Sequence, residues 1–292
     1  MLSGVFVLPG LAVGMTGGSA WLAFLLVAIC ILPAALSKAE LASALPQSGG
    51  AYVFINRAFG PLTGTIMGLG LWSSLLFKSA FSLVGFGAYL GVLDENSSTQ
   101  TLALGLLAVI TLLNLTGIKK VSQFQTVVVV LSLGALAVLT ATGIPVIDAT
   151  NFQPHFRHGI IGFSEAVAFV FISYAGVTKV AAIAGEVKSP GKNLPLAIII
   201  ALALITPIYC LVVFALNGVL SIEALEHNIH PIYSMAEVLL GSSGAYITAI
   251  VAILTMTSMA NAGLLASSRF PFAMSRDGLI PHFFGYIHQR YL

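Results

Sequence analysis

Seven long apolar stretches separated by short polar loops constrain this chain more than any other feature. They cover residues 19–45, 63–93, 102–115 with its flanks, 121–142, 163–184, 194–220 and 245–273. About 20 apolar residues, at roughly 1.5 Å each, cross the hydrocarbon core of a bilayer as a helix. Only 8% of the residues are charged, against about 25% in soluble domains. The sequence therefore predicts an all-α, multi-pass integral membrane protein of the cell membrane.

The fifth stretch, from Phe163 to Ala184, is interrupted near its middle by Ser173, Tyr174 and Gly176. An unpaired polar group facing lipid at that depth costs several kcal/mol. A helix that unwinds near Gly176 frees backbone groups that only a protein-lined cavity or a ligand can satisfy, which is how transporters build a midplane site from two half-helices. The alternative is a kinked helix whose serine and tyrosine bond to neighbouring helices.

Residues 1–13 form an apolar stretch that is too short to span the membrane. We expect half a helix that begins around Ser3 and runs toward Gly14. A helix N-terminus offers free backbone N–H groups and about half a positive charge, which suits a carboxylate. The alternative for this stretch is a frayed chain end.

Basic residues are unevenly divided between the two sides of the membrane when the spans alternate. One side has only Arg157. The other side has Lys38, Arg57, Lys119, Lys120, Lys188, Lys192, Arg269, Arg276 and Arg290. Cytoplasmic loops are enriched in lysine and arginine, so this second side is predicted to be cytoplasmic, with residues 94–100 and 221–237 outside. The net charge of +2 is too small to indicate a nucleic-acid partner.

Three blocks of sequence resemble the amino acid permeases of the amino acid–polyamine–organocation superfamily. The first joins residues 3–10, 38–42 and 46–52, the second joins 171–176 and 185–195, and the third is 268–281. The resemblance implies an inverted-repeat transporter fold of the five-plus-five helix type, with broken helices 1 and 6 and the substrate between the breaks.

The same resemblance implies one transmembrane transporter domain over residues 1–292. Residues 1–143 would be the first repeat, helices 1b to 5, and residues 159–292 a partial second repeat, helices 6 to 8. Family members usually have a further half-helix before this start and further helices after the eighth. We therefore expect a chain truncated at both ends.

The function that the resemblance implies is secondary active transport of amino acids by alternating access. The alternative is a non-transporting remnant or accessory subunit that binds substrate without moving it. A membrane enzyme is disfavoured because the sequence contains no HExxH, CxxC, GxSxG or P-loop pattern. Cys30 and Cys210 lie within apolar runs without metal-type spacing, so no metal or cofactor is expected.

The predicted substrate site consists mainly of backbone groups. N–H groups of the first half-helix would bind the substrate carboxylate, and C=O groups freed before Gly176 would bind its ammonium. Such contacts suit any amino acid, so selectivity would come from side chains facing the cavity, although aromatic residues in spans more often serve packing. The predicted residues are Ser3, Gly4, Val5, Phe6, Phe171, Ile172, Ser173, Tyr174 and Gly176, with Tyr174, Trp72 and Asn261 as selectivity candidates.

Two lysines and two hydroxyl residues are candidates for ion coupling. Lys179 follows Gly176 closely, where a buried lysine can carry a proton or replace a sodium ion, unless it snorkels to the headgroups. Lys78 is expected to snorkel to the outer interface in a structural role. Thr255 and Ser258 are possible sodium ligands, although such hydroxyls often bond the preceding turn. These residues favour a proton over sodium as the coupling ion.

Overall fold

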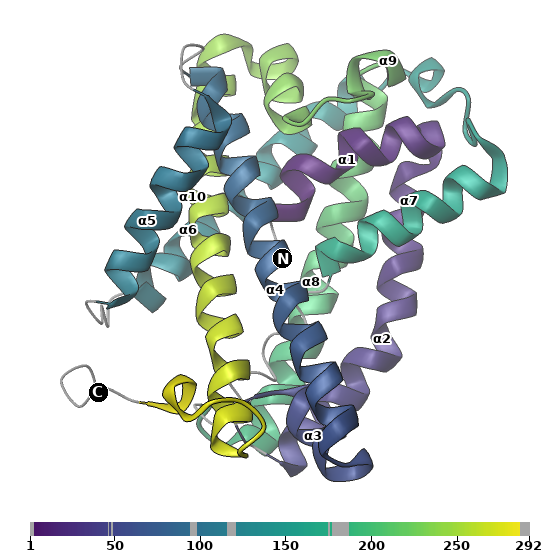
Figure 1. Cartoon of the computed structure of the whole chain (residues 1–292). Helices are drawn as coiled ribbons and strands as arrows, with labels where there is room; N and C mark the ends of the chain where they lie inside the picture. Colours follow the sequence, from purple (N-terminus) through teal and green to yellow (C-terminus); the bar gives the residue numbers. More distant parts are fainter. Residues whose placement is uncertain are drawn as a thin grey trace.

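The computed structural model describes residues 3–45, 47, 49–93, 98–115, 121–174, 176 and 187–286, and these form helices and connecting loops without a strand (Figure 1). The α-helices are α1 Ser3–Thr16, α2 Ala20–Ala44, α3 Ala51–Phe59, α4 Pro61–Leu93, α5 Thr99–Leu115, α6 Val121–Gly143, α7 Gly159–Tyr174, α8 Pro190–Val219, α9 Ile222–Leu225 and α10 Pro231–Arg276. Short 3₁₀ turns occupy η1 Gly17–Ser19, η2 Ile144–Val146, η3 Ala149–Phe152 and η5 His282–Gly285. The predicted all-α class is confirmed.

Five helical segments of the described residues are long and apolar enough to cross a membrane. They are Gly4–Ala44, Pro61–Leu93, Gln125–Val146, Pro190–Val219 and Pro231–Arg276. Two of the seven predicted spans, α5 and α7, are apolar but shorter, with 17 and 16 residues. In the case of α7 the helix ends at Tyr174, just before Gly176, where the sequence predicts a break.

The first long segment is not one straight helix, because α1 and α2 meet at a corner. Gly17 adopts a φ of 71°, a conformation that glycine tolerates and other residues rarely do. The corner is held from outside the helices, because Gly18 N–H donates to the Pro154 carbonyl at 3.2 Å and Asn217 Nδ2 donates to the Gly18 carbonyl at 3.1 Å. The half-helix predicted at the start of the chain is therefore present as α1.

Two pairs of long helices form most of the protein, α4 packed along α10 and α2 packed along α8. Figure 1 shows α1 lying between these pairs and α7 beside α1. The main core surrounds α1, and Phe6, Phe24, Tyr89, Tyr174 and Tyr209 are among its fully buried side chains. Helix α1 is therefore enclosed by protein, which is the position a buried site requires.

The polar stretch over residues 221–237 is interpreted from the sequence as a loop, and this is wrong because two helical segments lie within it. Helix α9 starts at Ile222, and α10 already starts at Pro231, where proline is favoured because its missing N–H would lack a helical partner anyway. Gly241, with a φ of 68°, divides α10 into a short helix over 231–240 and a long one over 242–276. Residues 221–237 are therefore mostly helical, in α9 and in the first part of α10.

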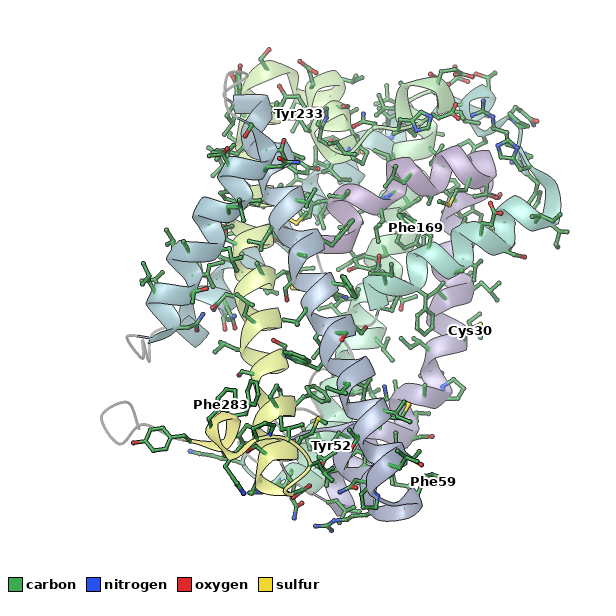
Figure 2. All side chains as sticks on the ribbon, viewed as in Figure 1. Cys30, Tyr52, Phe59, Phe169, Tyr233 and Phe283 are labelled. Atoms are coloured by element: carbon green, nitrogen blue, oxygen red, sulfur yellow. The ribbon has the colours of Figure 1, made fainter. Side chains whose placement is uncertain are left out.

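Different elements lie at the two ends of the helical bundle. Helix α3 and turn η5 lie at one end and α9 at the other, and the labelled Phe59 and Phe283 lie far from Tyr233 (Figures 1 and 2). At the first end, the Tyr52 hydroxyl donates to Asp277 Oδ2 at 2.7 Å and links α3 to the end of α10. Arg57 and Arg276 belong to these same two helices. That this end faces the cytoplasm remains a prediction.

Candidate functional site

The N-terminus of α1 and the C-terminus of α7 meet at Gly4 and Ser173. A Cβ atom added to Gly4 would lie 2.8 Å from Ser173 Cβ and 3.0 Å from Ser173 Cα, so only glycine permits this approach. The first N–H groups of α1 and the last C=O groups of α7 have no partners within their helices. The junction of these two helices, called the α1–α7 junction below, thus places a partial positive charge beside a partial negative one.

The predicted residues Val5 and Phe6 are fully buried in the first turns of α1. The Tyr89 hydroxyl of α4 donates to the Phe6 carbonyl at 2.6 Å, and the two rings meet edge to face with centroids 6.1 Å apart. Tyr89 was not among the residues predicted from sequence. The signal in the sequence was a tyrosine within an apolar span, since a buried tyrosine hydroxyl usually needs a hydrogen-bond partner.

Lys78 lies at the α1–α7 junction, and the expectation that it snorkels to the outer interface is wrong. The residue is buried, with 7% of its surface exposed. Its Nζ donates to the Ile172 carbonyl at 2.6 Å and to the Ser173 carbonyl at 3.5 Å. These two carbonyls are in the last turn of α7, where the helix supplies no donor, so they are free to accept hydrogen bonds from the buried ammonium group.

The remaining predicted residues of α7 point in different directions. Ser173 Oγ is buried and has no hydrogen-bond partner among the described residues. Tyr174 is fully buried, with its ring centroid 5.3 Å from that of Tyr209, which in turn packs on Phe24 at 5.7 Å. Phe171 is 44% exposed. The Tyr174 hydroxyl likewise has no hydrogen-bond partner by the distance and angle criteria among the described residues. The end of α7 therefore presents two buried hydroxyls and an aromatic wall that joins α7 to α8 and α2.

Two selectivity candidates pack elsewhere in the protein. Trp72 is partly buried against the cluster that contains Tyr52 and Met274, at the α3 end of the bundle. The Asn261 side-chain carbonyl accepts a hydrogen bond from Asn114 Nδ2 at 2.7 Å, which ties α10 to α5. The structure thus brings together the backbone residues of the predicted site but does not place these two side chains with them.

The ion-coupling candidates lie in separate places. Thr255 Oγ1 donates to the Val251 carbonyl at 2.7 Å and contacts Ser132 Oγ of α6. Ser258 is buried one turn further along α10. Gly176 is described as a turn, but Lys179 lies outside the described residues. Among those residues, no group of three histidine, cysteine or acidic side chains is positioned to hold a metal ion.

An ion pair covers the C-terminal end of α1. Arg157 Nη1 donates to Glu226 Oε2 at 2.6 Å, and the Arg157 backbone N–H donates to the Thr16 carbonyl at 3.2 Å. The hydrogen bond from Arg157 holds the pKa of the Glu226 carboxyl below its usual value. Arg157 thereby connects the loop before α7 to both α1 and α9.

This ion pair predicts an acid-sensitive contribution to stability. Because the pKa of Glu226 is lower in the folded protein, the contribution is present at neutral pH and is lost as the pH falls through that lowered pKa. We expect Glu226→Gln to lower the melting temperature in detergent at neutral pH and to match the unmodified protein in acid. The control is Glu223→Gln, three residues earlier and within α9. A difference between the Glu226 variant and the parent that stayed constant with pH would contradict this prediction.

Comparison with known proteins shows a match to the amino acid permease family over residues 1–291. The chain is 32% identical to the branched-chain amino acid permease BcaP and 30% identical to the methylthioribose transporter, both of Bacillus subtilis. These alignments cover 99% and 98% of the chain and 66% of each relative. It is also 28% identical to the serine/threonine exchanger SteT of the same organism, over 96% of the chain and 65% of that protein. The chain thus spans about two thirds of the length of these relatives.

Proposed function

Because this chain belongs to the amino acid permease family, we propose that it carries amino acids across the membrane by secondary active transport with alternating access. It is a multi-pass integral membrane protein with helices long enough to span a bilayer. The observation that best supports the proposal is the α1–α7 junction. There, the open ends of two helices meet at Gly4 and Ser173 inside the protein.

The α1–α7 junction suits a zwitterion. A carboxylate is stabilised by the free N–H groups and positive end of α1, and an ammonium by the free C=O groups and negative end of α7. The unused Ser173 hydroxyl lies beside both ends and offers a further hydrogen bond to a carboxylate. We assign the carboxylate to the N–H groups at Gly4, Val5 and Phe6, and the ammonium to the C=O groups of Phe171, Ile172 and Ser173.

Selectivity for the side chain of the amino acid would depend on the protein side chains around the α1–α7 junction. The relatives are named for branched-chain amino acids, for methylthioribose and for serine and threonine, so the family scaffold accepts chemically different solutes. In this chain we assign a wall to Tyr174, which is held in place by its contact with Tyr209. Trp72 and Asn261 have packing roles in this proposal.

We also propose the repeat organisation that the family resemblance implies. We assign residues 1–143 to the first repeat and 159–292 to the second, so that α1 is the half-helix that follows the first break and α7 is the half-helix that precedes the second. In alternating access, the pair α2 and α8 would then move against the pair α4 and α10, because each pair packs extensively within itself.

We further propose that transport is coupled to protons and not to sodium. Thr255 is engaged with the Val251 carbonyl and with Ser132, so its hydroxyl is already committed within and between helices. The lysine candidates of the sequence, Lys179 and Lys78, favour a proton as the coupling ion. Uptake that requires sodium would contradict this part of the proposal.

The proposed function is tested by equilibrium binding of the twenty radiolabelled L-amino acids to the purified protein in detergent. The expected result is saturable binding of at least one L-amino acid, weaker binding of its D-enantiomer, and exchange of the bound label across the membrane of proteoliposomes. Absence of binding for all twenty would refute the proposal.

A further inference from the structure

Lys78 occupies the part of the α1–α7 junction that is suited to a cation. Its Nζ contacts the Ile172 and Ser173 carbonyl oxygens at 2.6 and 3.5 Å. Both oxygens belong to the last turn of α7, where carbonyl groups lack helical partners and the helix carries about half a negative charge. The proposed function assigns these same oxygens to the ammonium group of the substrate.

Two ammonium groups do not share this position readily. A carbonyl oxygen has two lone pairs and so accepts two donors, but two positive charges within hydrogen-bonding distance of one oxygen repel each other strongly away from water. Since Lys78 is 7% exposed, little solvent is present to screen such a repulsion. An incoming amine therefore has to move the Lys78 ammonium away.

We propose that the Lys78 ammonium occupies the position of the substrate ammonium while the site is empty. In that state Lys78 donates hydrogen bonds to the α7 carbonyl groups, and it is displaced when an amino acid binds. This inference rests on the proposed function. It makes Lys78 an internal competitor that selects for ligands with an amine strong enough to take its place.

A place for the displaced side chain exists next to the junction. A groove of about 580 Å³, open to the protein surface beside the exposed Phe77 and Phe171, lies between α4 and α7, and Lys78 and Ile172 both line it. Its wall also includes the hydroxyl residues Ser73 and Ser74. Ser74 precedes Lys78 by four residues and so lies on the same face of α4, where it offers an oxygen to the displaced ammonium.

The size of the effect follows from how often Lys78 holds the carbonyl groups. The apparent dissociation constant of a ligand rises in inverse proportion to the fraction of protein in the binding-competent state. If Lys78 occupies the position about 90–99% of the time, the apparent affinity for an amine falls by about 10- to 100-fold. Removal of the Lys78 ammonium should therefore raise the apparent affinity for an amine by about the same 10- to 100-fold that is lost to occupancy by Lys78.

The test compares Lys78→Met with the unmodified protein, in detergent, against three ligands of one shape. They are L-leucine, 3-methylbutylamine, which lacks the carboxylate, and 4-methylpentanoate, which lacks the amine. We expect Lys78→Met to bind the two amines at least about 10-fold more tightly and 4-methylpentanoate with unchanged affinity. The matched control is Ser79→Ala, whose hydroxyl donates within α4 to the Leu75 carbonyl at 2.9 Å and should change none of the three.

Every other outcome overturns the inference. Weaker binding of L-leucine and 4-methylpentanoate would mean that Lys78 holds the carboxylate, and a loss for all three ligands with a lower melting temperature would mean that it only caps α7. Unchanged or absent L-leucine binding in Lys78→Met would also reject it. Should that variant fail to fold, Lys78→Gln, which keeps two donors without the charge, is judged by the same result. The proposed function fails separately, if none of the twenty amino acids binds the unmodified protein.

Discussion

A leucine at position 4 is expected to abolish amino acid binding while leaving the protein in the membrane. A Cβ at Gly4 already comes to 2.8 Å from Ser173 Cβ and 3.0 Å from the Ser173 Cα, and the branched side chain would fill the space between the two helix ends. The leucine side chain would then occupy the space proposed for the ligand. We therefore expect the affinity for the amino acid to fall by at least 100-fold, which corresponds to about 2.7 kcal/mol.

The control for this substitution is Gly134→Leu in α6. A Cβ at Gly134 has no atom within 4 Å, so leucine there is accommodated without displacing a neighbour. Both variants are compared by equilibrium binding of the tightest amino acid and by recovery from the membrane fraction. Parental affinity in Gly4→Leu would show that the α1–α7 junction is not the binding site.

An alanine at position 10 is expected to destabilise the protein, whereas the same change at position 14 is not. The Cβ at Gly10 would overlap the Asn228 carbonyl oxygen and lie 3.0 Å from the Leu225 carbonyl oxygen, and both are backbone atoms that cannot move aside cheaply. Overpacking of this kind costs about 1–3 kcal/mol. At Gly14 the nearest atom is Glu226 Cγ at 3.5 Å, an ordinary contact.

Comparing Gly10→Ala with Gly14→Ala separates the effect of packing on stability from the effect of helix propensity. Alanine in a helix interior is more favourable than glycine by roughly 1 kcal/mol, so Gly14→Ala should raise the melting temperature or leave it unchanged. Gly10→Ala should lower it, because the clash outweighs that gain. The measurement is thermal unfolding in one detergent at one protein concentration. Equal effects of the two substitutions would contradict the close approach of α1 to the segment after α9.

The sequence by itself determined the class of this protein and the end of α7 before Gly176. Apolar stretches of bilayer length required transmembrane helices, since backbone polar groups in lipid must be satisfied internally. The glycines and polar residues around Gly176 predicted the end of α7 at Tyr174, and the short apolar start predicted α1. These features are local, so they can be recognised in a single stretch of sequence.

Only the tertiary structure decided which side chains meet at the α1–α7 junction. Lys78 lies 94 residues from Ile172 and Tyr89 lies 83 residues from Phe6, and no local pattern places a lysine of α4 on the carbonyl groups of α7. The same limit applies to Asn261, whose partner Asn114 lies 147 residues away. Helix ends are set by local backbone chemistry, whereas the partner of a buried polar group depends on how the helices pack and rotate against one another.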